Sequence, residues 1–155
     1  MTPLALQILL VGVLAIEAAP IAAQPATTPA SPAPVVADPL FAALGGQDGI
    51  ARIAADFVPR MAADPRIGRF FECTDLVELR KQPTAQFCVV AGGPCVYEGA
   101  DMKKAHADMA ISKAAFNRSV ELLQLAMDAQ GIGFAVQNRL LARLAPMHRD
   151  IVAPH

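Results

Sequence analysis

Apolar residues recur at intervals of three and four along most of this chain, and no long run alternates apolar and polar residues as a half-buried strand does. Such spacing is typical of helices that bury one face. Two faces of this kind are clear, one formed by Ile50, Ile53, Ala54, Phe57, Val58 and Met61, the other by Phe116, Val120, Leu123 and Met127. The sequence therefore predicts an all-α fold.

Polar caps and glycine or proline breaks divide the body of the chain into expected helices. Asp75 followed by Glu78 resembles a capping box, and the double glycine at 92–93 is expected to end that helix. The expected segments are a helix over 50–61, a tight turn at 66–71, helices over 75–90 and 101–106, one from 112 to before 131, and one over 133–151.

The N-terminal 23 residues are expected to be a secretory signal peptide. Leu4–Ile16 is a 13-residue apolar run, which is shorter than the ~20 residues that span a membrane. Small residues follow, so cleavage after about Ala23 fits, and export to the bacterial periplasm follows. No Lys or Arg precedes Arg52, so an uncleaved inner-membrane anchor is the alternative, and this segment is then the chain's only contact with a membrane.

Residues 24–39 are rich in proline and alanine and are expected to form an extended linker. The folded domain is therefore expected over residues 40–152. The whole chain carries 13 basic and 14 acidic side chains and has no basic block. This balance argues against nucleic acid as a partner.

Residues 92–109 hold a glycine-proline turn and a short amphipathic segment with His106. Together with other residues along the chain, this segment resembles the group I truncated haemoglobins, which are small two-over-two helical globins. The resemblance covers Leu40 to Val152 and rests on LFAALGG at 40–46, Asp64-Pro65, Phe70-Phe71, Gly92-Gly93-Pro94, Tyr97, Gly99, Met102-Lys103, His106 and LAPMHRDIV at 144–152.

The resemblance implies a haem b whose iron is held by His106 as the proximal ligand. A ligating imidazole needs a carbonyl or carboxylate partner on its other nitrogen. Met102 is expected to pack on the porphyrin, and Lys103 and Tyr97 to reach its propionates. No Cys-x-x-Cys-His motif occurs, so the haem is expected to be non-covalent. Taken alone, His106 also fits a half-buried histidine without a ligand.

The same correspondence places the apolar wall of the pocket. Phe71 is expected to stack against the haem, with Phe57 beside it. Phe87 is expected to line the route of the gas, and Leu144 to close the pocket. Each of these side chains also fits an ordinary core position.

The distal side departs from the family pattern, in which a tyrosine and a glutamine donate hydrogen bonds to the bound gas. Here Val58 and Pro83 occupy those positions, and Leu79 occupies the distal-histidine site. Fast O₂ release is therefore expected. Pro83 is expected to kink its helix. Such a kink either turns Gln82 inward as a replacement donor or leaves Gln82 solvated.

The three cysteines leave two readings open. Cys88 and Cys95 are close enough in sequence to form a disulfide across the glycine turn, with Cys73 left over. Free cysteines in an apolar core are the alternative.

Three functions remain from the sequence. The first is reversible binding of a diatomic gas (O₂, CO or NO) at haem iron. The second is an NO dioxygenase that converts NO and O₂ to nitrate and needs an electron-donating reductase. The third is an exported helical interaction module without haem.

Overall fold

The computed structural model describes residues 38–153. The expected signal or anchor at 1–23 and nearly all of the linker at 24–39 lie outside the described residues. Between residues 38 and 153, no helix is both long enough and apolar enough to cross a membrane.

All regular elements of the described chain are helices and none is a strand, which confirms the prediction of an all-α fold. The elements are α1 (Pro39–Ala43), α2 (Gly46–Ala63), η1 (Gly68–Phe71), α3 (Leu76–Val90), α4 (Met102–Ala105), α5 (Lys113–Ala129), α6 (Phe134–Leu144), η2 (Ala145–Met147) and α7 (His148–Ile151).

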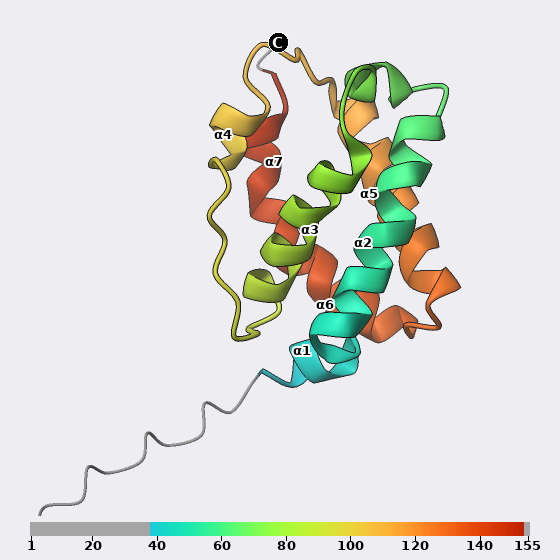
Figure 1. The fold of residues 1–155 in the computed structure, drawn as a ribbon, viewed down its shortest axis with the longest axis vertical. Helices are drawn as coiled ribbons and strands as arrows, with labels where there is room; N and C mark the ends of the chain where they lie inside the picture. Colours follow the sequence, from blue (N-terminus) through green and yellow to red (C-terminus); the bar gives the residue numbers. More distant parts are fainter. Residues whose placement is uncertain (1–37, 154–155) are drawn as a thin grey trace, which may run out of the picture. The chain divides into compact units, whose positions relative to one another are not determined.

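The long helices form two pairs that enclose one core. Helix α2 packs on both α3 and α5, while α6 packs on α3 and α5, and α4 lies against α7 (Figure 1). The core is made of apolar side chains from all the long helices, namely Leu40, Leu44, Ile50, Ile53, Phe57, Val58, Ile67, Phe87, Cys88, Ala91, Leu122, Leu123, Ala126, Met127 and Leu140.

Side-chain caps begin three of the helices where the sequence predicts them. The Asp75 carboxylate accepts the amides of residues 77 and 78 at 2.8 and 3.2 Å. Asp101 accepts the Lys104 amide at 2.8 Å, and Ser112 accepts an amide one turn on at 3.1 Å. Each cap satisfies an amide that has no partner inside its helix.

The expectation of a single helix over 133–151 is wrong. Helix α6 ends at Leu144, a 3₁₀ turn covers Ala145–Met147, and α7 begins at His148. Pro146 lies in that turn and has no amide hydrogen, so it cannot donate to the carbonyl four residues earlier. By contrast, α3 runs as one helix through Pro83, and the Thr84 hydroxyl donates to the Arg80 carbonyl at 2.7 Å.

Candidate cofactor site

His106 lies at the C-terminal end of α4 and is half-buried. Its Nδ1 is 2.8 Å from the carbonyl oxygen of Met102. A carbonyl can only accept, so Nδ1 carries the proton and donates it. In this tautomer the second ring nitrogen, Nε2, is the one that can offer a lone pair to a metal. This is the orienting partner that a ligating histidine requires.

The short helix that carries His106 is fixed at its start by Asp101. The Lys104 amide bonds to the Asp101 carboxylate and is the largest of the effects that lower the pKa of that carboxyl group. Because α4 spans only four residues, it is too short to be stable by itself. Its position depends on the cap, on α7, and on the segment that joins it to α3.

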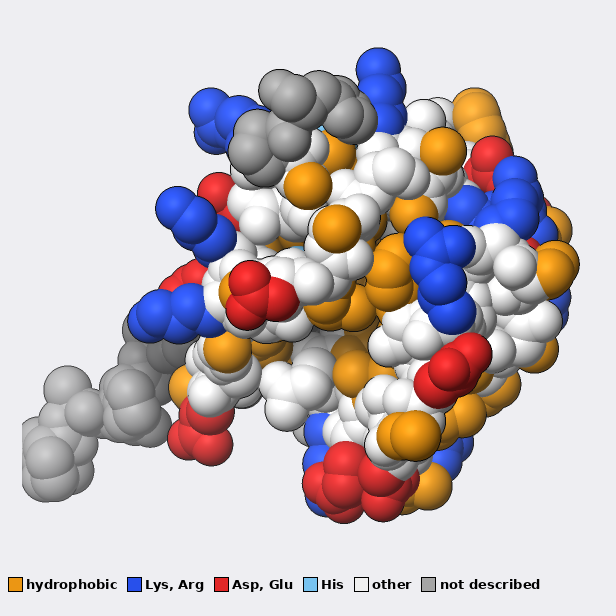
Figure 2. Space-filling view, turned by 90° about the horizontal axis from the view of Figure 1, so that it is seen from above, with side chains coloured by type: hydrophobic (Ala, Val, Ile, Leu, Met, Phe, Trp, Pro, Cys, Tyr) orange, Lys and Arg blue, Asp and Glu red, His pale blue; other side chains and the backbone are white. Residues whose placement is uncertain are grey.

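The end of the molecule where α4 and α7 lie is hollowed. Seen from that end, the surface has a hollow with largely hydrophobic walls and with Lys and Arg side chains around it (Figure 2). The predicted wall residues Phe71, Leu79 and Leu144 pack on the core while remaining partly exposed. Partly exposed apolar side chains of this size are typical of a surface that binds a large apolar group.

Two predicted wall residues and one distal residue are instead deep in the core. Phe57 and Phe87 are 7 % and 4 % exposed, and their ring centroids are 6.1 Å apart. Val58 is fully buried. These three side chains belong to the hydrophobic core, and their roles in lining a haem pocket stay predictions.

The side chain of Gln86 extends from α3 to Met102 in α4. Its Nε2 lies 3.1 Å from the sulfur of Met102 and 3.4 Å from the sulfur of Met147. Gln82 is exposed, and its side-chain oxygen lies against Gly99. This exposed position fits the solvated alternative for Gln82 rather than the inward-turned one, and its role at the site stays a prediction.

A sequence signal for Gln86 does exist. Leu79, Pro83 and Gln86 are spaced at i, i+4 and i+7, so they share one face of α3. Pro83 is half-buried on that face.

The two residues expected at the propionates occupy different settings. The Tyr97 hydroxyl donates to the Ala100 carbonyl at 2.9 Å, so it must give up this bond in order to donate to a propionate. Burial and, second, the Asp101 carboxylate raise the pKa of Tyr97. Lys103 is exposed on α4, so its side chain can extend toward an anion.

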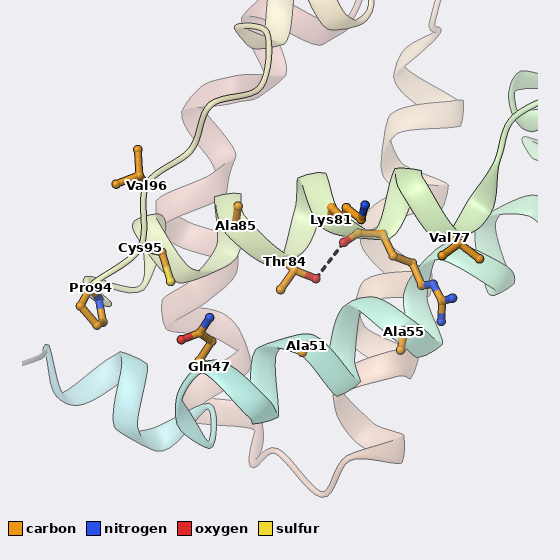
Figure 3. Close-up of a pocket in the computed structure, with 11 residues that line it drawn as sticks. Gln47, Ala51, Ala55, Val77, Lys81, Thr84, Ala85, Pro94, Cys95 and Val96 are labelled. Atoms are coloured by element: carbon orange, nitrogen blue, oxygen red, sulfur yellow. Dashed lines mark hydrogen bonds between the residues drawn. The ribbon is translucent and has the colours of Figure 1, made fainter.

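Cys88 and Cys95 form a disulfide, with 5.9 Å between their Cα atoms. This settles the two readings in favour of a bridge, and Cys73 is left as an exposed free thiol. A second hollow, of about 540 Å³, lies between α2, α3 and residues 94–96. Cys95 is in its wall, together with Ala51, Ala55 and Ala85 (Figure 3). No residue predicted for the haem site lines it.

Two helix pairs around one core, with His106 at the end of a short helix, are the arrangement expected of a small globin. The chain matches the Bacterial-like globin family over residues 39–153 and belongs to that family.

Curated relatives are group 1 truncated haemoglobins. That of Tetrahymena pyriformis is 27% identical over 113 residues, which cover 73% of this chain and 93% of the relative. GlbN of Mycolicibacterium paratuberculosis is 27% identical over 112 residues, which cover 72% of this chain and 82% of the relative. The predicted membership of the truncated globins is thus confirmed.

Solved structures give the same result for the fold. The Fe(III) truncated haemoglobin of Tetrahymena pyriformis superposes with a TM-score of 0.71 at 27% identity, covering 74% of this chain and 98% of that one. The 2/2 haemoglobin of Synechococcus sp. PCC 7002, with covalently attached haem, has a TM-score of 0.68 at 21% identity, covering 73% and 97%. The two-over-two fold is confirmed, whereas the roles of the individual pocket residues stay predictions.

Proposed function

We propose that this protein holds haem b non-covalently through His106 and binds a diatomic gas reversibly. The observation that carries the proposal is the hydrogen bond between His106 Nδ1 and the Met102 carbonyl, which leaves Nε2 as the ring nitrogen that can bind a metal. Haem, when bound, supplies an iron atom with a coordination position for the gas.

The surrounding side chains suit a flat apolar cofactor with an anionic edge. Phe71, Leu79 and Leu144 offer partly exposed apolar surface that would keep water from the site. Lys103 is free to pair with a propionate by charge. Met102 is one turn before His106 and presents a soft, adaptable side chain to the ring.

The distal residues favour simple gas binding over NO dioxygenation. Val58, Leu79 and Pro83 carry no side-chain N–H or O–H, so they offer no hydrogen bond to the partial negative charge of bound O₂. The dioxygenase reaction needs O₂ to stay bound until NO arrives, and needs a reductase to restore ferrous iron. A weakly held O₂ fits a reversible binder better.

We further propose that the protein works outside the cytoplasm, in the periplasm or anchored to the inner membrane. The Cys88–Cys95 disulfide supports this, because such bridges persist in oxidising compartments. The apolar run Leu4–Ile16 supports it independently.

The test is titration of the full chain with hemin, followed by reduction and exposure to CO, O₂ and NO. Wild type should show a Soret band that saturates at one haem per chain, and His106→Ala should lose stoichiometric binding. His148→Ala is the matched control, because its ring packs edge-on against Phe116 with centroids 4.9 Å apart. Retention of haem by His106→Ala with an unchanged ferrous spectrum would refute the proximal assignment.

A wild-type chain with no Soret band would instead support the interaction module without haem. Extraction with acidified organic solvent tests the attachment. All of the haem should leave the protein, and haem that stays with the chain would show a covalent link.

A further inference from the structure

The segment between α3 and α4, residues 91–101, has no regular helix, yet it leads directly to the helix that carries His106. Its beginning is held firmly. The Gly93 amide donates to the Cys88 carbonyl at 2.8 Å, and the Asp38 amide donates to the Gly92 carbonyl at 3.3 Å. The first residues of the segment are therefore fixed to the end of α3 and to the start of the domain.

The Cys88–Cys95 disulfide extends this attachment to the middle of the segment. Cys88 is fully buried in the core, and Cys95 lies beside the C-terminal end of α3 (Figure 3). Gly93 allows the close approach, because a Cβ there would lie 2.7 Å from the Cys88 sulfur and would also strike the Phe41 ring. The bridge thus fastens the segment to the core at a tightly packed point.

Beyond Cys95 the segment is held more loosely. Val96 is 75 % exposed, and the Tyr97 hydroxyl bonds within the segment itself, to Ala100. Gly99 lies against the side chain of Gln82, which is itself exposed. The disulfide is therefore a covalent tie between the distal helix α3 and the chain that leads to His106.

We propose that the Cys88–Cys95 disulfide positions His106, by setting how far α4 can move from α3. This inference rests on the proposed function, because His106 must be the iron ligand. Opening the bridge frees the segment beyond Gly93 and enlarges the set of positions open to α4. The site then holds haem less firmly, and the bond between His106 and iron changes in strength.

A purely structural disulfide predicts something different. If the bridge acts only on stability, its loss lowers the free energy of unfolding and leaves the geometry at His106 unchanged. That loss of stability should be modest, because the bridge joins residues only seven apart. Two measurements separate these cases. They are the iron–histidine stretching frequency of the ferrous protein, from resonance Raman spectra, and the rate of haem transfer to an excess of an acceptor apoglobin.

The matched pair of full-length proteins is Cys73→Ala and the Cys73→Ala, Cys95→Ala double variant. Cys73 is exposed and unbridged, so the first protein keeps the disulfide. The second keeps only the buried Cys88 thiol, which avoids both mispairing and a cavity in the core. We expect the double variant to lose haem roughly tenfold faster, which corresponds to about 1.4 kcal/mol, with a shifted stretching frequency.

Equal transfer rates and equal frequencies in the two proteins would overturn the inference and leave the proposed function intact. A wild-type chain without a Soret band would overturn both. If the double variant fails to fold, haem-loaded Cys73→Ala is treated with a dithiol and capped, and helix content is checked by circular dichroism. The stretching frequency and the rate of haem transfer are then compared before and after reduction, and no change in either would overturn the inference.

Discussion

At the scale of the residue, the proposed haem site depends on which polar atoms of each side chain already have a hydrogen-bond partner. The position of His106 in the sequence predicts an iron ligand only through the family resemblance. In the structure, the Met102 carbonyl occupies Nδ1 and leaves Nε2 for the metal. Every residue has a backbone carbonyl, so the sequence could not show which carbonyl would accept the hydrogen bond from His106 Nδ1. Gln86 was not predicted at the site, because a kink at Pro83 would reorient the adjacent Gln82 rather than Gln86.

Val58→Tyr tests whether the pocket lacks a hydrogen-bond donor. A hydrogen bond to a partly charged ligand contributes roughly 1.5–3 kcal/mol, so we expect O₂ to dissociate roughly 10–100-fold more slowly. Stopped-flow displacement of O₂ by CO measures the rate. Val58→Phe adds similar bulk without a hydroxyl and should not slow dissociation. An unchanged rate in Val58→Tyr would mean that another group already supplies the bond.

Gln86→Leu identifies that group if it exists. The Gln86 amide is occupied by the sulfurs of Met102 and Met147, which are weak acceptors. Because no bond to the gas is lost, we expect O₂ dissociation to stay within about twofold of wild type, a difference of about 0.4 kcal/mol. A rate that rises tenfold in the same stopped-flow assay would assign Gln86 as the distal donor.

At the scale of the element, local signals predicted three helix starts correctly and one helix end wrongly. Asp75, Asp101 and Ser112 act as caps because the relevant contacts lie within a few residues. The break at Pro146 was missed because the apolar spacing from Leu144 onward continues through it. Tertiary packing determines whether such a proline kinks a helix or ends it, and that packing is not local in sequence.

Gly93→Ala should disrupt the turn after α3, where space rather than backbone conformation is limiting. The added methyl group would meet both the Phe41 ring and the Cys88 sulfur. Overpacking of this kind lowers the free energy of unfolding by about 1–3 kcal/mol, and we expect the upper half of that range in urea titrations.

Gly133→Ala is the control, because a Cβ at this position has no neighbour within 4 Å. Its cost should stay below about 1 kcal/mol, which is the loss expected when alanine replaces a glycine helix cap. Equal effects of the two substitutions would show that the turn can relax around the methyl group.

At the scale of the whole molecule, the sequence predicted the architecture because its signals are spread along the chain. Apolar periodicity and regularly placed breaks define the long helices, and the family pattern arranges them. Contacts between distant residues were not predictable in this way. Asp64 closes α2 and also bonds Arg118 in α5, at 2.8 Å, across 54 residues. The sequence around Asp64 gives no indication that Arg118 is its partner.

That long-range ion pair makes the stability of the fold depend on pH. The Asp64 side chain is 4 % exposed. Burial by itself would raise the pKa of Asp64, but the hydrogen bonds from Arg118 and from the Arg66 amide, with the charges of both arginines, outweigh it. The pKa is therefore lowered from its ordinary value of 3.8. A carboxylate with a lowered pKa stabilises the fold above its unfolded-state pKa, and this contribution is lost as the pH falls through the folded-state value.

Thermal unfolding of the haem-free chain between neutral pH and pH 3 should reveal this dependence. We expect the wild-type midpoint to be steady at neutral pH and to fall as the pH approaches and passes below 3.8. Asp64→Asn should unfold at a lower temperature at neutral pH and should lose less of its midpoint on acidification, because its amide does not titrate. The remaining fall comes from other carboxylates with lowered pKa values, Asp38, Asp101 and Glu121. Asp48→Asn removes an exposed carboxylate and should follow the wild-type curve. Parallel curves for Asp64→Asn and wild type would show that the Asp64–Arg118 pair does not couple α2 to α5.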